Sequence, residues 1–146
     1  MFTAESTDFD NGATVPERFT CDGSDAAPQI LIHDPPEGTR SLALTTIDPD
    51  APSGEFVHWL VYDIPPDGEE LAAMRGKTLK NGFGRIGYGG PCPPPGDRAH
   101  RYVFTVYAVD VPTLSLRAGE RGELEQALKT HTLATAQFSG RYARKK

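Results

Sequence analysis

The sequence predicts a mainly β fold, and three observations support this. Several runs rich in β-branched and aromatic side chains alternate apolar with polar residues, which is the pattern of half-buried strands. The 15 glycines and 13 prolines cluster between these runs, where turns need them. Only one segment, near the end of the chain, has the spacing of an amphipathic helix. The length of 146 residues fits a single domain over residues 1–146.

Five segments carry the strand pattern. The three clearest are Ser41–Ile47, Val57–Ile64 and Arg101–Asp110. Two shorter candidates precede them in the chain, Ala13–Thr20 and Gln29–His33. Because each run is short and bounded by glycine or proline, we expect separate strands connected by turns rather than one long element.

One helix is predicted over about Arg121–Ala136. Leu124 and Leu128 lie four residues apart, so they share one face of a helix, and Gly140 is suited to end it. We expect this helix to cover one face of the sheet. A shorter helical turn is predicted over Glu69–Arg75.

A long irregular loop is predicted over Asn81–Gly96. It contains six glycines and four prolines, which excludes regular structure. A loop of this length inside a compact domain is usually functional or disordered. Its aromatic residues and its position before a strong strand favour a functional loop.

The charge balance excludes one class of partner. The chain carries 20 acidic and 15 basic residues, a net charge of −5, whereas nucleic-acid binding needs a basic face. Residues 1–6 have neither the basic nor the apolar region of a signal peptide, and no apolar run reaches membrane-spanning length. We therefore expect a cytoplasmic protein without integral membrane association.

The two cysteines, Cys21 and Cys92, are too few to indicate a disulfide scaffold. A chain of this length buries a core large enough to fold without a covalent link. We expect two separate, reduced thiols, with a mutual bridge as the alternative.

Polar side chains that suit a binding site gather in two segments. The first reads Asp48-Pro49-Asp50-Ala51-Pro52 and is followed by His58-Trp59. The second reads Gly87-Tyr88-Gly89-Gly90-Pro91-Cys92-Pro93-Pro94-Pro95-Gly96 and is followed by His100-Arg101-Tyr102. Each joins a loop rich in proline or glycine to a predicted strand, so both supply carboxylate, imidazole or phenol groups at strand ends.

The spacing of these residues predicts which side chains meet. His100 and Tyr102 lie two apart and therefore project from one face of their strand, while Arg101 projects from the other. Asp48 precedes a proline, which favours extended backbone, although an aspartate here could simply brace a turn. His58 alternates with Leu60, so we place it on the same apolar face, where a hydrogen-bonded core histidine is the alternative to a ligand-binding one.

These motifs, in this order, resemble the phosphatidylethanolamine-binding protein family, in particular its bacterial and archaeal branch described as Raf kinase inhibitor-like. Weaker similarities extend over Phe19–Gly23, Asn81–Gly84 and Gly140–Arg144. The sequence departs from many relatives near Ile32-His33, where they carry a tryptophan. The resemblance implies an antiparallel β-sandwich with few peripheral helices and a C-terminal helix.

The resemblance also implies the site. Residues that match its anion-binding pocket are Asp48, His58, His100 and Tyr102, with Gly89, Gly90 and Pro94 on the rim. We expect Asp50, Trp59 and Tyr88 to support the pocket. Since Gly89 and Gly90 lack a Cβ atom, their N–H groups could approach an anion closely.

The resemblance implies non-catalytic binding of a small anionic or phosphorylated ligand, such as phosphoethanolamine, and a role in inhibiting or modulating a kinase or a protease. It also implies a homodimer. Two alternatives stay open: a hydrolase that uses His58 or His100 as general base, and an interaction protein with a vestigial pocket. Asp48, His58 and His100 could ligate a metal, but the spacing does not favour it. No cofactor is expected, and Gly-x-Ser-x-Gly and Walker motifs are absent from the sequence.

Overall fold

The computed structural model describes residues 1–145 and consists of two antiparallel sheets packed face to face. The small sheet pairs β1 (Thr3–Ser6) with β2 (Ile30–His33). The large sheet has the order β5-β4-β3-β6-β7. Its strands are β3 (Ser41–Asp48), β4 (Phe56–Ile64), β5 (Lys77–Thr78), β6 (His100–Val109) and β7 (Thr132–Tyr142). The predicted mainly β sandwich is confirmed.

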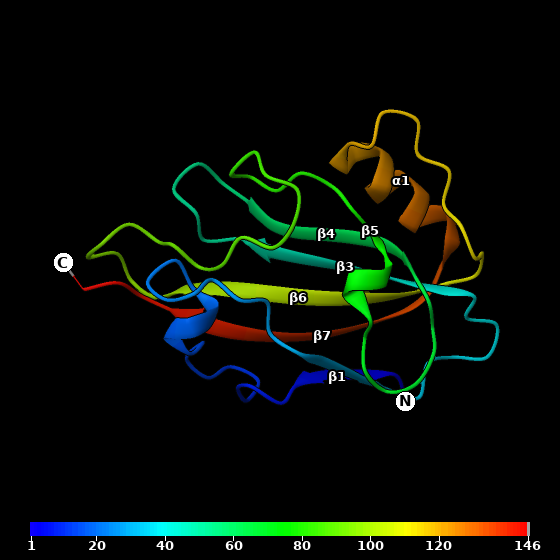
Figure 1. Ribbon diagram of the computed structural model, residues 1–146, viewed down its shortest axis with the longest axis horizontal. Helices are drawn as coiled ribbons and strands as arrows, with labels where there is room; N and C mark the ends of the chain where they lie inside the picture. The colour runs from blue at the N-terminus through cyan, green and yellow to red at the C-terminus, as the bar shows by residue number, and fades with distance from the viewer. Residues whose placement is uncertain (146) are drawn as a thin grey trace.

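The large sheet buries apolar side chains on both faces. Figure 1 shows the small sheet on one side of it and the helix α1 (Arg121–His131) on the other. Leu42 and Leu44 of β3 point toward the small sheet, and Ala43 points toward α1. Leu124 and Leu128, the predicted apolar stripe, anchor α1 to the sheet. The helix covers only part of its face, which leaves the opposite end of that face open.

The strand predictions are confirmed for the four segments that form β2, β3, β4 and β6, and every predicted boundary is within one residue of the observed one. The prediction over Ala13–Thr20 is wrong: the segment contains a 3₁₀ turn, η1 (Glu17–Phe19), and a single bridge at Thr14. Pro16 precedes this turn, and a proline lacks the N–H that a strand ladder needs. Strand β1 was not predicted. The expected helical turn near Arg75 is a 3₁₀ turn, η2 (Ala73–Arg75).

The C-terminal helix is shorter than predicted. It ends at His131, and the chain passes directly into β7, which pairs with β6 along nearly its whole length. The prediction of helix to Ala136 is therefore wrong, since ladder pairing with a long central strand outweighs a weak helical pattern. Gly140 does not cap a helix but lies in β7 opposite Tyr102.

The prediction of two separate thiols is also wrong, because Cys21 and Cys92 form a disulfide. Their Cα atoms lie 5.4 Å apart, and the Cys21 N–H donates to the Pro91 carbonyl at 3.1 Å. The bridge thus fastens the turn after η1 to the long loop before β6. Disulfides are typical of oxidising compartments, and the cytoplasmic location stays an untested prediction.

No helix within residues 1–145 is long and apolar enough to cross a membrane.

Candidate functional site

A pocket of about 210 Å³ opens at one end of the large sheet. Because neighbouring strands run antiparallel, the end of β3 and the starts of β4 and β6 meet at this edge. The polar lining residues are Asp48, His58, His100 and Tyr102. The remaining lining residues are Ala51, Pro52, Phe56, Phe83, Cys92, Pro93 and Pro94. The pocket therefore combines a polar floor with largely apolar walls, which is the usual composition of a small-molecule site.

His58 reaches this pocket through a β-bulge. Trp59 pairs with Thr46 and Val57 pairs with Ile47, so His58 is the extra residue between two ladder pairs. The bulge turns His58 to the pocket face, whereas Leu60 lines the opposite face of the sheet. The predicted placement of His58 on the face of Leu60 is therefore wrong. Its ring packs edge-on against Tyr102, with the ring centroids 5.1 Å apart.

The backbone of Gly89 fixes the His58 imidazole. The His58 Nδ1 atom lies 2.7 Å from the Gly89 carbonyl oxygen, and the Gly89 N–H donates to the His58 carbonyl at 2.9 Å. Since a carbonyl only accepts, Nδ1 carries the proton and Nε2 is the nitrogen left for a ligand. Burial lowers the pKa of His58, although the Gly89 hydrogen bond and the Asp48 charge act in the opposite direction. The ring is neutral near pH 7.

His100 lies between two carboxylates. Its Nδ1 donates to Asp48 Oδ2 at 2.7 Å, and its Nε2 donates to Asp97 Oδ2 at 3.1 Å. Burial alone would lower the pKa of His100, but the hydrogen bonds to Asp48 and Asp97 outweigh it and raise that pKa. We therefore assign an imidazolium, with both ring nitrogens protonated. Asp48 also accepts the Asp50 N–H at 2.8 Å, so it both braces a turn and orients the imidazole.

Tyr102 brings an unused hydroxyl to the pocket. The side chain is 1% exposed, and its hydroxyl has no hydrogen-bond partner among the residues that the structure describes. Burial raises the pKa of Tyr102 above its ordinary value, and the negative charge of Asp48 raises it further. The group is thus a neutral donor. A buried tyrosine hydroxyl normally has a partner, which makes this one available to a ligand.

The predicted rim is only partly in place. Pro94 lines the pocket, but Gly89 and Gly90 do not. Their N–H groups are already used, by the His58 carbonyl at 2.9 Å and by Asp25 Oδ1 at 2.9 Å. The expectation that these N–H groups bind an anion is therefore not met. A Cβ atom on Gly90 would lie 2.2 Å from the Phe19 carbonyl oxygen, so glycine here permits close packing of two loops.

The expected supporting residues lie around the pocket. Asp50 binds the Arg101 guanidinium at 2.9 and 3.0 Å on the outer side of β6. Trp59 packs edge-on against Tyr88, with centroids 5.2 Å apart, and the Tyr88 hydroxyl donates to the Phe19 carbonyl at 2.8 Å. The Asp50 ion pair ties the turn after β3 to β6, and the Tyr88 contacts hold the loop that carries Gly89.

Sequence reasoning missed most of the apolar walls of the pocket and two of the supporting carboxylates. Asp97 and Asp25 hold His100 and Gly90, and Phe83 supplies one apolar wall. Only Asp97 could have been predicted from the sequence, because it lies three residues before His100. Among residues 1–145, no cluster of three or more histidine, cysteine, aspartate or glutamate side chains could hold a metal ion.

Comparisons with known proteins agree with this architecture. The family model described as phosphatidylethanolamine-binding protein matches residues 5–143. A UPF0098 protein of Aquifex aeolicus is 45% identical over 95% of this chain and 86% of its own length. A UPF0098 protein of Pyrococcus abyssi is 42% identical over 96% of this chain and 84% of its own length.

Two crystal structures share the fold. The phosphatidylethanolamine-binding protein homologue CT736 from Chlamydia trachomatis is 33% identical, with a TM-score of 0.89 over 98% of this chain and 97% of its own. E. coli YbcL, described as a new member of the mammalian family, is 28% identical, with a TM-score of 0.90 over 99% of both chains. The chain therefore belongs to the phosphatidylethanolamine-binding protein family, together with these bacterial and archaeal relatives.

Proposed function

We propose that this protein binds a small anionic or phosphorylated ligand, without catalysis, in the pocket formed by Asp48, His58, His100 and Tyr102. The observation that carries the proposal is the buried Tyr102 hydroxyl, which has no partner in the described chain. Its ring packs against the His58 and His100 rings. A phosphate oxygen accepts hydrogen bonds and would supply the missing partner.

The two histidines contribute differently to such binding. The His100 imidazolium attracts an anion by charge. The His58 Nε2 atom, unprotonated in the neutral ring, accepts from a protonated phosphate oxygen, and it donates to an anion only once the ring is protonated at lower pH. An anion that accepts from His100 Nε2 must displace the Asp97 carboxylate. The Asp97 side chain is 41% exposed, so it can turn to solvent without unfolding the loop.

The lining favours binding over catalysis. Among the described residues that line the pocket there is no serine or threonine, and the one cysteine is part of the disulfide. A hydrolase would have to activate water with a histidine alone. The two functions are separated by incubation with phosphoethanolamine at neutral pH, because only a hydrolase releases inorganic phosphate.

A modulating role toward a kinase or a protease is the finer part of the proposal. If a ligand displaces Asp97, the exposed segment from Pro94 to Asp97 changes its surface charge. A partner protein that docks there could distinguish the free form from the bound form.

Calorimetric titration with phosphoethanolamine tests the proposal. His58→Ala removes a ligand contact and should weaken binding by about 1.5–3 kcal/mol, or roughly tenfold or more. Arg101→Ala is the matched control, since the Arg101 side chain lies on the opposite face of β6. No saturable binding by the unmodified protein, or equal losses in both variants, would reject the pocket as the binding site.

A further inference from the structure

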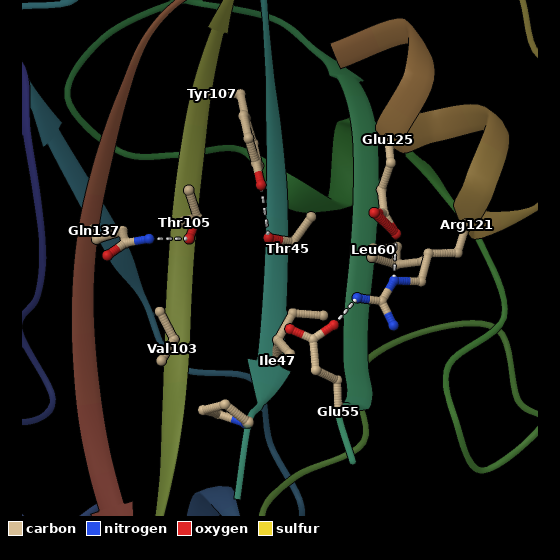
Figure 2. Close-up of a pocket in the computed structure, with 11 residues that line it drawn as sticks. Thr45, Ile47, Glu55, Leu60, Val103, Thr105, Tyr107, Arg121, Glu125 and Gln137 are labelled. Atoms are coloured by element: carbon tan, nitrogen blue, oxygen red, sulfur yellow. Dashed lines mark hydrogen bonds and ion pairs between the residues drawn. The ribbon is translucent and has the colours of Figure 1, made fainter. Parts of the chain in front are cut away.

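A second groove lies on the other face of the large sheet, beside α1. Its volume is about 320 Å³, within the range of small-ligand sites. Figure 2 shows the open sheet surface on one side and Arg121 and Glu125 of the helix on the other. Strands β3 and β6 separate it from the anion pocket, so the two sites open on opposite faces.

A row of polar side chains crosses the floor of this groove. Thr45 of β3 lies opposite Thr105 of β6, which in turn lies opposite Gln137 of β7. With neighbouring strands about 4.8 Å apart, the row spans roughly 10 Å. Thr45 and Thr105 are only 6% and 7% exposed. These polar groups are therefore nearly buried in the sheet, yet they border an open groove.

The side chains of this row have donors and acceptors that their mutual hydrogen bonds do not use. The Gln137 amide N–H₂ donates to the Thr105 hydroxyl at 3.1 Å, which leaves the Thr105 hydrogen and the Gln137 carbonyl oxygen to bind something else. The Thr45 and Tyr107 hydroxyls share a long contact of 3.4 Å, and only one of their two hydrogens can serve it. The floor thus offers both donors and acceptors to a ligand.

The charged side chains beside the helix (the Arg121 wall) add further hydrogen-bond donors and acceptors to the groove. Arg121 Nη2 donates to Glu55 at 2.6 Å, and Arg121 Nε donates to Glu125 at 2.6 Å. This arrangement holds the guanidinium in place, with Nη1 hydrogens left over, and each carboxylate retains a second oxygen. A simple anion would meet two carboxylates, and a simple cation would meet the guanidinium. The wall suits neither.

Ile47, Leu60 and Val103 supply apolar surface between these polar groups. A sugar matches this combination, because each hydroxyl both donates and accepts while its ring faces carry C–H groups. The geometry points to a second binding site, formed by Thr45, Thr105, Gln137, Tyr107 and the Arg121 wall, for a neutral, multiply hydroxylated ligand such as a mono- or disaccharide.

Titration followed by two-dimensional NMR of the labelled protein tests this site. The probes are glucose, galactose, maltose and lactose at up to tens of millimolar, with sulfate as the anionic comparison. At least one sugar should give saturable shifts at Thr45, Thr105 and Gln137, and sulfate should leave these signals unchanged. Saturating sulfate in the anion pocket should not displace the sugar.

Thr105→Val keeps the β-branched shape but removes the central hydroxyl, and it should weaken sugar binding about three- to tenfold. Thr46→Val is the matched control, because Thr46 is the neighbour of Thr45 on the opposite face. If Thr105→Val disturbs folding, Gln137→Met replaces it, since Gln137 is exposed. The proposal is overturned if no sugar gives saturable shifts, if sulfate shifts the groove signals, or if Thr105→Val or Gln137→Met binds as tightly as the unmodified protein.

Discussion

The hydroxyl of Tyr102 is buried without a hydrogen-bond partner in the described chain, an arrangement that destabilises the ligand-free molecule. Tyr102→Phe removes only this oxygen and keeps the ring that packs against His58. We expect the variant to be more stable by about 1 kcal/mol and to bind phosphoethanolamine more weakly by about 0.5–1.5 kcal/mol. Denaturant unfolding and calorimetry measure the two effects. A variant that loses stability would show that the hydroxyl has a partner in solution.

The two histidines predict a pH profile with two steps. The pKa of His100 is raised, so its charge is present below about 6.5 and is lost as the pH rises through a higher value. The pKa of His58 is lowered, so its charge appears only below about 6.5. Anion affinity should therefore fall once as the pH rises toward 6.5 and again above it.

Sulfate is the suitable probe for this profile, because the second pKa of a phosphate monoester, about 6, would overlap the first step. His100→Asn should abolish the upper step and keep the lower one. A single step below 6.5 in the unmodified protein would mean that Asp48 and Asp97 do not hold the His100 proton.

Sequence reasoning identified the four polar residues that line the pocket but not the orientation of each. His100 and Tyr102 share a face as their spacing predicts. His58 does not follow the same rule, because an inserted bulge residue leaves no mark in a period-two pattern. The glycine-rich loop shows the same limit. Its sequence suggests N–H donors free for a ligand, but the fold shows that the Gly89 N–H already donates to the His58 carbonyl of the bulged strand.

At the level of the elements, the disulfide should contribute much of the stability of the loop before β6. It closes a loop of 71 residues, and such a link typically adds about 2–4 kcal/mol. Replacing both cysteines, Cys21→Ser with Cys92→Ser, should lower the melting temperature by roughly 10 °C. Calorimetry of the oxidised protein, the reduced protein and the double variant measures this. A loss of only one or two degrees would indicate that packing alone holds the loop.

Replacing either of two glycines near the end of the chain by alanine should change the stability of the protein, in opposite directions. A Cβ atom on Gly140 of β7 would lie 2.5 Å from Val15 Cγ2 and 2.8 Å from Phe9 Cε2, so Gly140→Ala should destabilise the protein by about 1–3 kcal/mol. Gly122 in α1 has no atom within 4 Å of that position, so Gly122→Ala should stabilise it by about 0.5–1 kcal/mol. Urea unfolding of both variants tests the pair, and a tolerated Gly140→Ala would contradict the packing.

The boundary between α1 and β7 explains why the predicted helix is longer than the observed one. Residues Arg121–His131 carry a helical stripe, and the alanines of the next segment do not interrupt it. Thr132 begins β7 without an intervening turn, so no glycine or proline marks the boundary. The partner that decides the conformation is β6, which lies about thirty residues earlier in the chain. Such long-range pairing cannot be deduced from local periodicity.

For the whole molecule, the sequence supported the mainly β class because the central strands β3, β4 and β6 have strong patterns. It could not provide the sheet order or the pairing of Cys21 with Cys92, since both depend on distances between remote segments. The homodimer stays a prediction. Sedimentation equilibrium at tens of micromolar should show a mass of twice 15.8 kDa, and a purely monomeric profile would refute it.

The disulfide also divides the pocket between two parts of the chain. Asp48 and His58 lie within the closed loop between Cys21 and Cys92, whereas His100 and Tyr102 follow it. The exposed segment 52–55 is a ready site for a protease. A single cut there leaves two fragments joined through sulfur, and a denaturing gel separates them only after reduction. A nicked molecule would therefore run with the mass of the intact one and keep both halves of its site on one covalent particle.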